Sequence, residues 1–139
     1  MRTRFAPSPT GLLHLGHAFS ALMAWDLAQG SGGEFLLRIE DIDGTRCRPE
    51  YEAAILDDLR WLGLAWPEPV IRQSERLPLY REALERLRSA GLVYPCTCTR
   101  RDIREALAAP QEGASRAAVY PGTCRGRTDL PEDAVWRLD

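Results

Sequence analysis

The sequence contains no lysine, so all 18 of its basic side chains are arginines, and no site in this chain can rely on a lysine. It also has no apolar run of about 18 residues, the length that a membrane-spanning helix needs. Its first residues, MRTRFAPSPT, show no signal-peptide pattern. We therefore expect a cytoplasmic protein with no membrane partner. A net charge of −2 gives no overall attraction to nucleic acid, so such a contact requires a local patch.

Histidine is scarce, and both histidines lie in the short segment HLGH, as His14 and His17. Neutral imidazole is a common zinc ligand, so the pair can be interpreted as part of a metal site. The pair can also serve an anion, because Gly16 lets a phosphate come close to the main chain. The two residues alone leave both interpretations open.

Four cysteines, Cys47, Cys96, Cys98 and Cys124, occur in a chain without an export signal. This favours a metal site or free thiols over disulfides. The two thiolates of the CTC segment can bind one zinc ion, and Cys124 supplies a third ligand. With the histidines placed elsewhere, the residue types alone predict three cysteines and a water. Cys47, isolated in TRCRPE, is interpreted as an incidental thiol.

The length of 139 residues suits one domain with a sizeable core. Alternating patterns and glycine or proline boundaries predict strands at 2–6, 34–40 and 69–73, with helices at about 17–29, 49–62 and 74–91. Ser74 is expected to cap the third helix. A short helix at 100–109, a loop at 108–118 and a strand-like end at 134–139 follow. Strands alternating with helices predict an α/β fold with a parallel sheet and right-handed crossovers.

In parallel α/β sheets, ligands bind beyond the carboxyl ends of the strands. PSPTGLLHLGH follows the first predicted strand, and the acidic segment EDID follows the second. We therefore expect the histidines and Glu40 to lie at the same edge of the sheet. For Asp41 and Asp43, a capping or turn role is an open alternative to direct function.

HLGH at the head of a helix, after a strand and a proline-rich turn, resembles the first signature of the class I aminoacyl-tRNA synthetases. RFAPSPTG, RIEDID, WLGL and QSERLPLY are similar to the glutamyl branch, and the match runs from Arg4 to about Tyr80. The resemblance implies a Rossmann-like catalytic domain that uses ATP with Mg²⁺ to activate L-glutamate. Negative charge then builds up on the phosphoryl oxygens, where donors at a helix N-terminus stabilise it.

The same resemblance implies a role for each matching residue. His14 and His17 would be the catalytic residues, and the ATP-binding set would be Pro7, Thr10, Gly11, His14, Gly16 and His17. Arg4 would pair with a glutamate carboxylate, and Glu40 would receive the α-ammonium group. The complete glutamate-binding set would be Arg4, Phe5, Ala6, Pro7, Ser8 and Glu40.

The segments CTCTR and VYPGTCR resemble the zinc-binding insertion of the glutamyl-queuosine tRNA(Asp) synthetases. In that group a tyrosine oxygen completes the site, which implies that zinc is bound by Cys96, Cys98, Tyr120 and Cys124. The resemblance further implies transfer of glutamate to queuosine in the anticodon of tRNA(Asp). The segment between the cysteine pair and Tyr120 is longer than is usual in the group.

The second class I signature, a KMSK-type loop, needs a lysine, which this sequence does not contain. We therefore expect the N-terminal half of an enzyme: residues 1–95 as the first half of the nucleotide-binding domain, 96–126 as the zinc-binding insertion, and 127–139 as its truncated continuation. Such a chain is expected to be inactive by itself. Two alternatives stay open: a fragment of an ordinary glutamyl-tRNA synthetase, and a zinc-stabilised, non-catalytic module that binds tRNA or a protein.

Overall fold

The computed structural model describes residues 1–108, 120–127, 129, 131 and 134–139, and the loop expected up to residue 118 falls outside them from residue 109 onward. These residues form two compact units, Met1–Leu79 and Tyr80–Asp139. The first unit contains β1 (Arg2–Phe5), α1 (Leu15–Gly30), β2 (Glu34–Ile39), α2 (Pro49–Trp61), β3 (Ile71–Arg72) and the short 3-10 helix Ser74–Arg76. Helix α3 (Leu77–Ser89) starts at the end of the first unit and continues into the second. Strand β4 (Val93–Cys96), helix α4 (Arg100–Ala108) and strand β5 (Val135–Leu138) follow.

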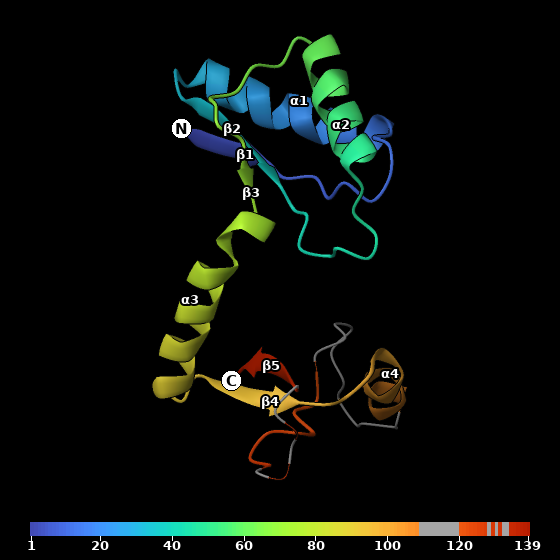
Figure 1. The fold of residues 1–139 in the computed structure, drawn as a ribbon, viewed down its shortest axis with the longest axis vertical. Helices are drawn as coiled ribbons and strands as arrows, with labels where there is room; N and C mark the ends of the chain where they lie inside the picture. Colours follow the sequence, from blue (N-terminus) through green and yellow to red (C-terminus); the bar gives the residue numbers. More distant parts are fainter. Residues whose placement is uncertain (109–119, 128, 130, 132–133) are drawn as a thin grey trace. The chain divides into compact units, whose positions relative to one another are not determined.

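The first unit is built on a parallel sheet with the strand order β1-β2-β3, as the sequence predicted. Helices α1 and α2 connect successive strands and cover the same face of the sheet (Figure 1). On that face, Phe35, Leu37 and Ile39 of β2 are buried with alternate spacing, and Ile55 and Leu59 of α2 pack into the same cluster. Alternation along the strand therefore separates a core face from an open face.

The open face of the sheet carries Arg4 of β1 together with Leu36 and Arg38 of β2. Arg4 pairs with Leu36 in the strand register. Arg38 comes two residues after Leu36, so it lies on the same face. On the other face, the Thr3 hydroxyl donates a hydrogen bond of 2.6 Å to the carbonyl oxygen of Ala24 in α1. The arginines of these two strands thus point away from the helices.

Two expected elements differ from the structure, and both differences arise from polar side chains. The strand expected at 69–73 is limited to Ile71–Arg72, because Pro69 has no N–H and the N–H of Val70 donates to the Glu68 carboxylate at 3.0 Å. Ser74 does not cap α3, so that prediction is wrong. Its N–H and hydroxyl both donate to Asp41, at 2.9 and 2.5 Å.

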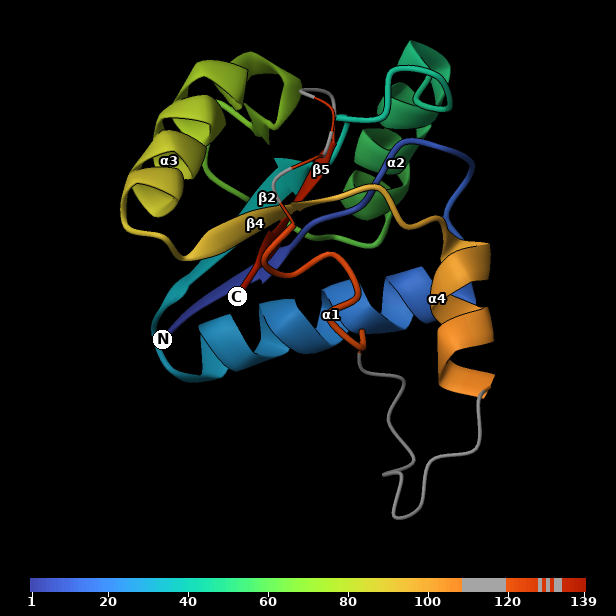
Figure 2. The ribbon, with the colours of Figure 1, turned by 90° about the horizontal axis from the view of Figure 1, so that it is seen from below.

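The second unit contains the antiparallel pair β4-β5, seen from a second direction in Figure 2. Residues 93–95, which lie before the expected boundary at residue 95, pair with residues 136–138 after the cysteine segments. Within the described part of the chain, no helix is both long and apolar enough to cross a membrane.

The core of the first unit predicts the effect of a substitution in α2. Leu59 is fully buried, so Leu59→Ala should lower the free energy of unfolding by about 2–5 kcal/mol. Trp61 lies two residues further on and is 86% exposed, so Trp61→Ala should change that free energy by about 0.5 kcal/mol or less. Denaturant unfolding followed by circular dichroism measures both, and equal losses would contradict the observed orientation of α2.

Candidate active site and metal centre

The first turn of α1 is held by its two imidazoles. His14 is the N-cap residue, with extended backbone angles, and its Nδ1 accepts a hydrogen bond of 3.1 Å from the N–H of Gly16. In return, Nδ1 of His17 accepts a hydrogen bond of 3.2 Å from the N–H of His14. Two main-chain donors that would otherwise lack a partner at the helix start are therefore satisfied by histidine.

These hydrogen bonds determine which imidazole nitrogen is available to a ligand. A nitrogen that accepts a hydrogen bond carries no proton, so each neutral ring of His14 and His17 must carry its proton on Nε2. The ring centroids are 3.8 Å apart, with 30° between the ring planes. The head of α1 thus presents two neighbouring N–H donors next to a helix N-terminus, an arrangement suited to an anion.

Gly16 leaves space that this arrangement uses. A Cβ atom at this position would lie 3.1 Å from Cε1 and 3.2 Å from Nδ1 of His14, closer than normal contacts. The sequence suggested that Gly16 keeps the main chain clear of a ligand. The structure adds that it also makes room for the capping ring.

The histidine segment and the acidic segment line two neighbouring cavities in the first unit. One, of about 280 Å³, is lined by Ala6, Pro7, Ser8, Thr10, Gly11, Leu12, Leu13 and His17. The other, of about 240 Å³, is lined by Ser8, Thr10, Glu40, Ile42, Asp43, Arg46, Cys47 and Gln73. Because Ser8 and Thr10 belong to both, the cavity of His17 adjoins that of Glu40, whereas His14 lines neither.

Main-chain hydrogen bonds fix the proline-rich turn between these cavities. The N–H of Glu40 donates to the carbonyl of Pro7 at 2.9 Å, and the N–H of Arg48 donates to that of Pro9 at 3.0 Å. Pro9 is fully buried. The turn is therefore tied both to the end of β2 and to the start of α2, which gives its lining residues a defined position.

The acidic residues after β2 have different partners. Glu40 is half-buried and forms an ion pair with Arg38. Burial would raise the pKa of Asp41, but the hydrogen bonds from the hydroxyl and N–H of Ser74 outweigh it, so this pKa lies below its usual value. Asp43 accepts hydrogen bonds from the Thr45 hydroxyl and from Arg46, which lower its pKa to about 2. All three carboxylates thus have partners within the protein, and Glu40 and Asp43 also line the same cavity.

Three other residues considered from the sequence lie as follows. The side chain of Phe5 is buried in the core, which leaves only its main chain for a ligand. Arg4 is exposed on the open face of the sheet and lines neither of the two cavities described above. Cys47 lines the cavity of Glu40, and burial together with the charge of Asp43 raises the pKa of its thiol, so it is not an activated nucleophile.

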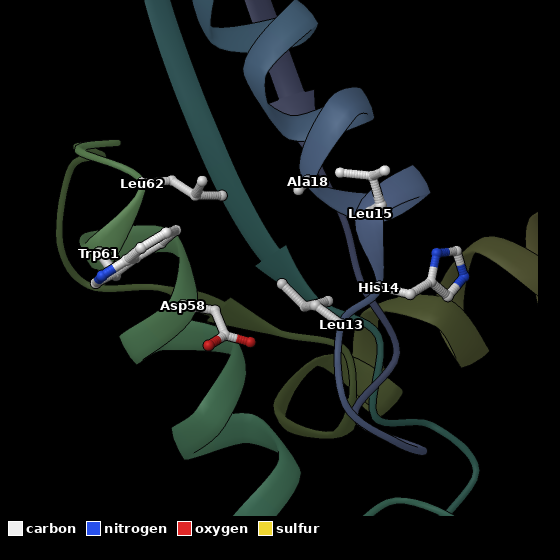
Figure 3. A pocket seen from close by; sticks show the side chains of 7 residues that line it. All are labelled: Leu13, His14, Leu15, Ala18, Asp58, Trp61 and Leu62. Carbon is white, nitrogen blue, oxygen red and sulfur yellow. The ribbon is translucent and has the colours of Figure 1, made fainter.

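A third groove, on the α2 side of the HLGH segment, was not predicted from the sequence. It has a volume of about 240 Å³ and is lined by Leu13, His14, Leu15, Ala18, Asp58, Trp61 and Leu62. Figure 3 shows His14 and Trp61 on opposite sides of this groove, with the His14 ring pointing away from Trp61. Leu15 and Trp61 are each 86% exposed, which is high for large apolar side chains. In the sequence, the apolar residues of and around HLGH and WLGL are the one feature from which this groove could have been predicted.

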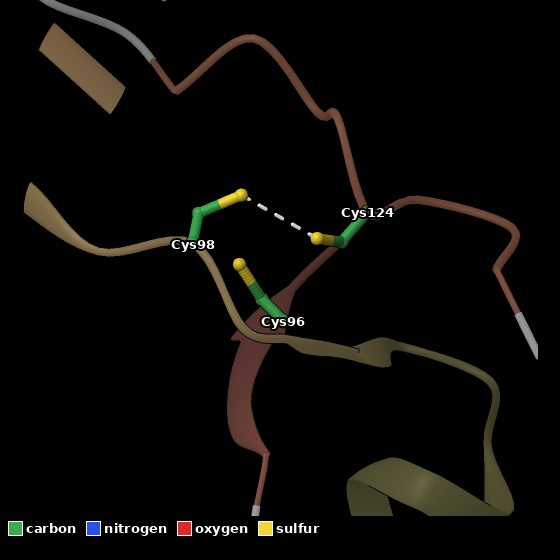
Figure 4. Close-up of side chains that lie close together, drawn as sticks. All are labelled: Cys96, Cys98 and Cys124. Carbon is green, nitrogen blue, oxygen red and sulfur yellow. Dashed lines mark hydrogen bonds between the residues drawn. The ribbon is translucent and has the colours of Figure 1, made fainter. Parts of the chain in front are cut away.

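The second unit brings the three predicted cysteines together. Cys96 and Cys98 come from the end of β4 and the segment after it, and Cys124 comes from the segment before β5 (Figure 4). Their sulfur atoms all lie within 4.8 Å of one another, and those of Cys98 and Cys124 are 3.5 Å apart. Cys96 and Cys124 are almost completely buried. Such a cluster can hold a metal ion.

Tyr120 supplies a fourth donor to this cluster. Its hydroxyl oxygen lies 3.2 Å from the sulfur atoms of both Cys96 and Cys98. For a tetrahedral zinc ion, ligand atoms would be separated by roughly 3.5–3.8 Å, so the donor set fits after small adjustments. Burial and the neighbouring thiols raise the pKa of Tyr120. A hydrogen bond from the main chain of Thr97 lowers the pKa of Cys124 to about 6.

Comparisons with known proteins found a matching family model and several similar proteins. The family model for class I tRNA synthetases (E and Q), catalytic domain, matches residues 1–130. Glutamyl-Q tRNA(Asp) synthetase of Rhodobacter capsulatus is 65% identical over 144 residues, which cover 97% of this chain and 52% of that protein. Glutamate–tRNA ligase 1 of Acidithiobacillus ferrooxidans is 46% identical, covering 95% of this chain and 28% of that protein.

A solved structure is also similar. The glutamate tRNA ligase of Elizabethkingia meningosepticum, crystallised with its amino acid, matches with a TM-score of 0.66 and 37% identity, covering 76% of this chain and 23% of that one. The chain spans about half, or less, of the length of the curated relatives it matches.

The capping hydrogen bond at the head of α1 predicts how substitutions of His14 affect stability, separately from any role in binding a ligand. His14→Ala removes the acceptor for the N–H of Gly16 and should lower the free energy of unfolding by about 0.5–2 kcal/mol. His14→Asn keeps an acceptor at the N-cap and should cost only a few tenths of a kcal/mol. Both are measured by denaturant unfolding. The same large loss in both variants would show that capping is not what the His14 ring contributes.

Proposed function

The chain belongs to the family of class I tRNA synthetase (E and Q) catalytic domains, and on that basis we propose that it carries the ATP- and glutamate-binding site of a glutamyl-queuosine tRNA(Asp) synthetase. The observation that carries this proposal is the pair of cavities that share Ser8 and Thr10, with His17 in one and Glu40 in the other. Their shared lining supports the proposal of a phosphate site in the first and an amino acid site in the second.

In the proposed reaction, a carboxylate oxygen of L-glutamate bonds to the α-phosphorus of ATP. The bond from that phosphorus to the bridging oxygen breaks, and pyrophosphate leaves with the electron pair. Negative charge on the phosphoryl oxygens is stabilised by Nε2–H of His14 and His17, whose orientation is fixed by their Nδ1 hydrogen bonds. Mg²⁺, bound with ATP, would offset part of the triphosphate charge.

Glutamate is proposed to bind with its α-ammonium group on the carboxylate of Glu40. The half-buried position of Glu40 in its cavity supports this role, because a carboxylate shielded from water attracts an ammonium group more strongly. Main-chain groups from Phe5 to Ser8 would line the rest of the amino acid site. Arg4, on the open face of the sheet, is proposed to pair with a glutamate carboxylate.

The metal centre is proposed to bind one zinc ion through Cys96, Cys98, Tyr120 and Cys124. Three sulfur donors and one oxygen donor favour zinc over magnesium or calcium, which prefer oxygen ligands. Its role would be structural, because it joins the end of β4 to the segment that leads into β5. The zinc-binding region, residues 96–126, is then an insertion in the catalytic domain.

The acceptor is proposed to be queuosine in the anticodon of tRNA(Asp), which places the reaction in the cytoplasm. A second candidate is transfer to the 3′ end of a tRNA, favoured by the 46% identity to a glutamate–tRNA ligase. Charging total tRNA with labelled glutamate, in a version that includes the rest of the length seen in the relatives, separates the two. Label released with the queuosine nucleoside supports the first, and label on the terminal adenosine supports the second.

The catalytic role of the histidines predicts a kinetic effect in that longer version. His17→Ala removes one donor to the transition state and should lower the rate of glutamate-dependent ATP–pyrophosphate exchange by about 100-fold or more. Ser20→Ala, an exposed position further along α1, is the control and should leave the rate unchanged. An unchanged rate in His17→Ala would contradict the proposed role. The 139-residue chain, which has no lysine to neutralise the triphosphate, should show little or no exchange.

The proposed metal centre predicts the metal content of the purified chain. One zinc ion per chain is expected, and Cys98→Ser should lose most of it because one of three thiolate ligands is removed. Cys47→Ser serves as the control, since Cys47 is not part of the cluster. Elemental analysis under reducing conditions measures the content. Less than about half an equivalent in the unmodified chain, or full zinc content in Cys98→Ser, would refute the assignment.

A further inference from the structure

Arg137 lies against the cluster of Cys96, Cys98, Tyr120 and Cys124 without being one of its donors. It is on β5 directly opposite Tyr94 of β4, so its side chain shares a face with Tyr94 and with Cys96. Its guanidinium carbon lies 4.2 Å from the centroid of the Tyr120 ring. The neighbouring Cys96 thiol is the main cause that raises the pKa of the Arg137 guanidinium. Arg137 therefore stacks on one of the four proposed ligands and shares a strand face with a second.

The surroundings of Arg137 differ from those of the neighbouring arginines. Arg125 is paired with the Asp139 carboxylate at 2.6 Å, and Arg127 with that of Asp129 at 2.7 Å. Arg137 is half-buried, and within the described residues its Nε is inaccessible to solvent and has no hydrogen-bond partner. In the parts of the chain that the structure describes, no carboxylate forms an ion pair with Arg137, and its guanidinium stacks on a proposed ligand instead.

The charge of a loaded site explains what a cation contributes at this position. Three thiolates and a phenolate carry four negative charges, which exceed the two positive charges of zinc. The surplus disfavours a buried site unless a positive group lies close to it. A guanidinium is always charged, stacks on aromatic rings and is less strongly hydrated than an ammonium, so arginine suits this place better than lysine.

We propose that Arg137 is a positioning residue of the metal centre, which stabilises the metal-loaded cluster by offsetting its surplus negative charge and holding the Tyr120 ring against it. This inference rests on the proposed zinc site, and it adds to that site a residue that supplies no ligand atom. Neighbouring groups of this kind typically change metal affinity by about 10–100-fold.

Zinc affinity of the 139-residue chain tests this proposal. The metal-free protein, kept reduced, is titrated with zinc in competition with a chromophoric chelator of known affinity. Arg137→Gln should weaken zinc binding by about 10–100-fold, and Arg137→Lys should give an intermediate value because it keeps the charge and loses the planar group. Arg88→Gln is the matched control. Arg88 also stacks on a ring of the second unit, at 4.4 Å from that of Trp136, but contacts no proposed ligand.

The outcomes separate this inference from the proposed metal site. If the unmodified chain binds no zinc, the site itself is refuted. If the unmodified chain and Arg137→Gln bind zinc equally well, or if Arg88→Gln weakens binding as much as Arg137→Gln, the role of Arg137 is refuted. Cobalt(II) absorption checks the fold of the variant: a tetrahedral cobalt spectrum that appears only at higher metal concentration in Arg137→Gln supports the proposal, and an unchanged cobalt affinity overturns it.

Discussion

The candidate active site depends on two hydrogen bonds between main-chain N–H groups and imidazole Nδ1 atoms at the head of α1. They satisfy donors of the helix start, and they also leave Nε2–H of His14 and His17 as the groups that can reach a ligand. Gly16 permits this because any Cβ there would press on the His14 ring. A single local arrangement thus supports the helix and prepares a site for an anion, so that little reorganisation is needed when charge develops.

The parallel sheet of the first unit brings the proposed amino acid site next to this helix start. β1 and β2 end at the same edge, and the hydrogen bond from Glu40 to Pro7 joins the residues that follow them. The ion pair between Arg38 and Glu40 restrains the carboxylate in its cavity. The proposed metal centre gathers donors that would become anionic on binding a metal, and Arg137 stacks on one of them, Tyr120.

Local sequence patterns predicted the elements whose formation depends on near neighbours. The alternation around Phe35, Leu37 and Ile39, and Pro49 at the start of α2, identified β2 and α2 within a residue or two. The cysteine spacing and the resemblance identified the cluster with Tyr120. The sequence missed contacts between distant residues: Ser74 bonds to Asp41 instead of capping α3, and β4 pairs with β5 from the other end of the second unit. Such pairings depend on the tertiary fold, which no short window of sequence contains.

The tautomer of the two histidines tests the account most directly, because the proposed phosphate contacts require a proton on Nε2 of both rings. Long-range ¹H–¹⁵N correlation spectra of the ¹⁵N-labelled chain, recorded at about pH 8 where imidazole is ordinarily neutral, distinguish the two nitrogens of each ring. The account predicts that His14 and His17 both carry the proton on Nε2, with Nδ1 unprotonated. A proton on Nδ1 of either ring would contradict it, because that nitrogen could not accept the main-chain hydrogen bond on which the site depends.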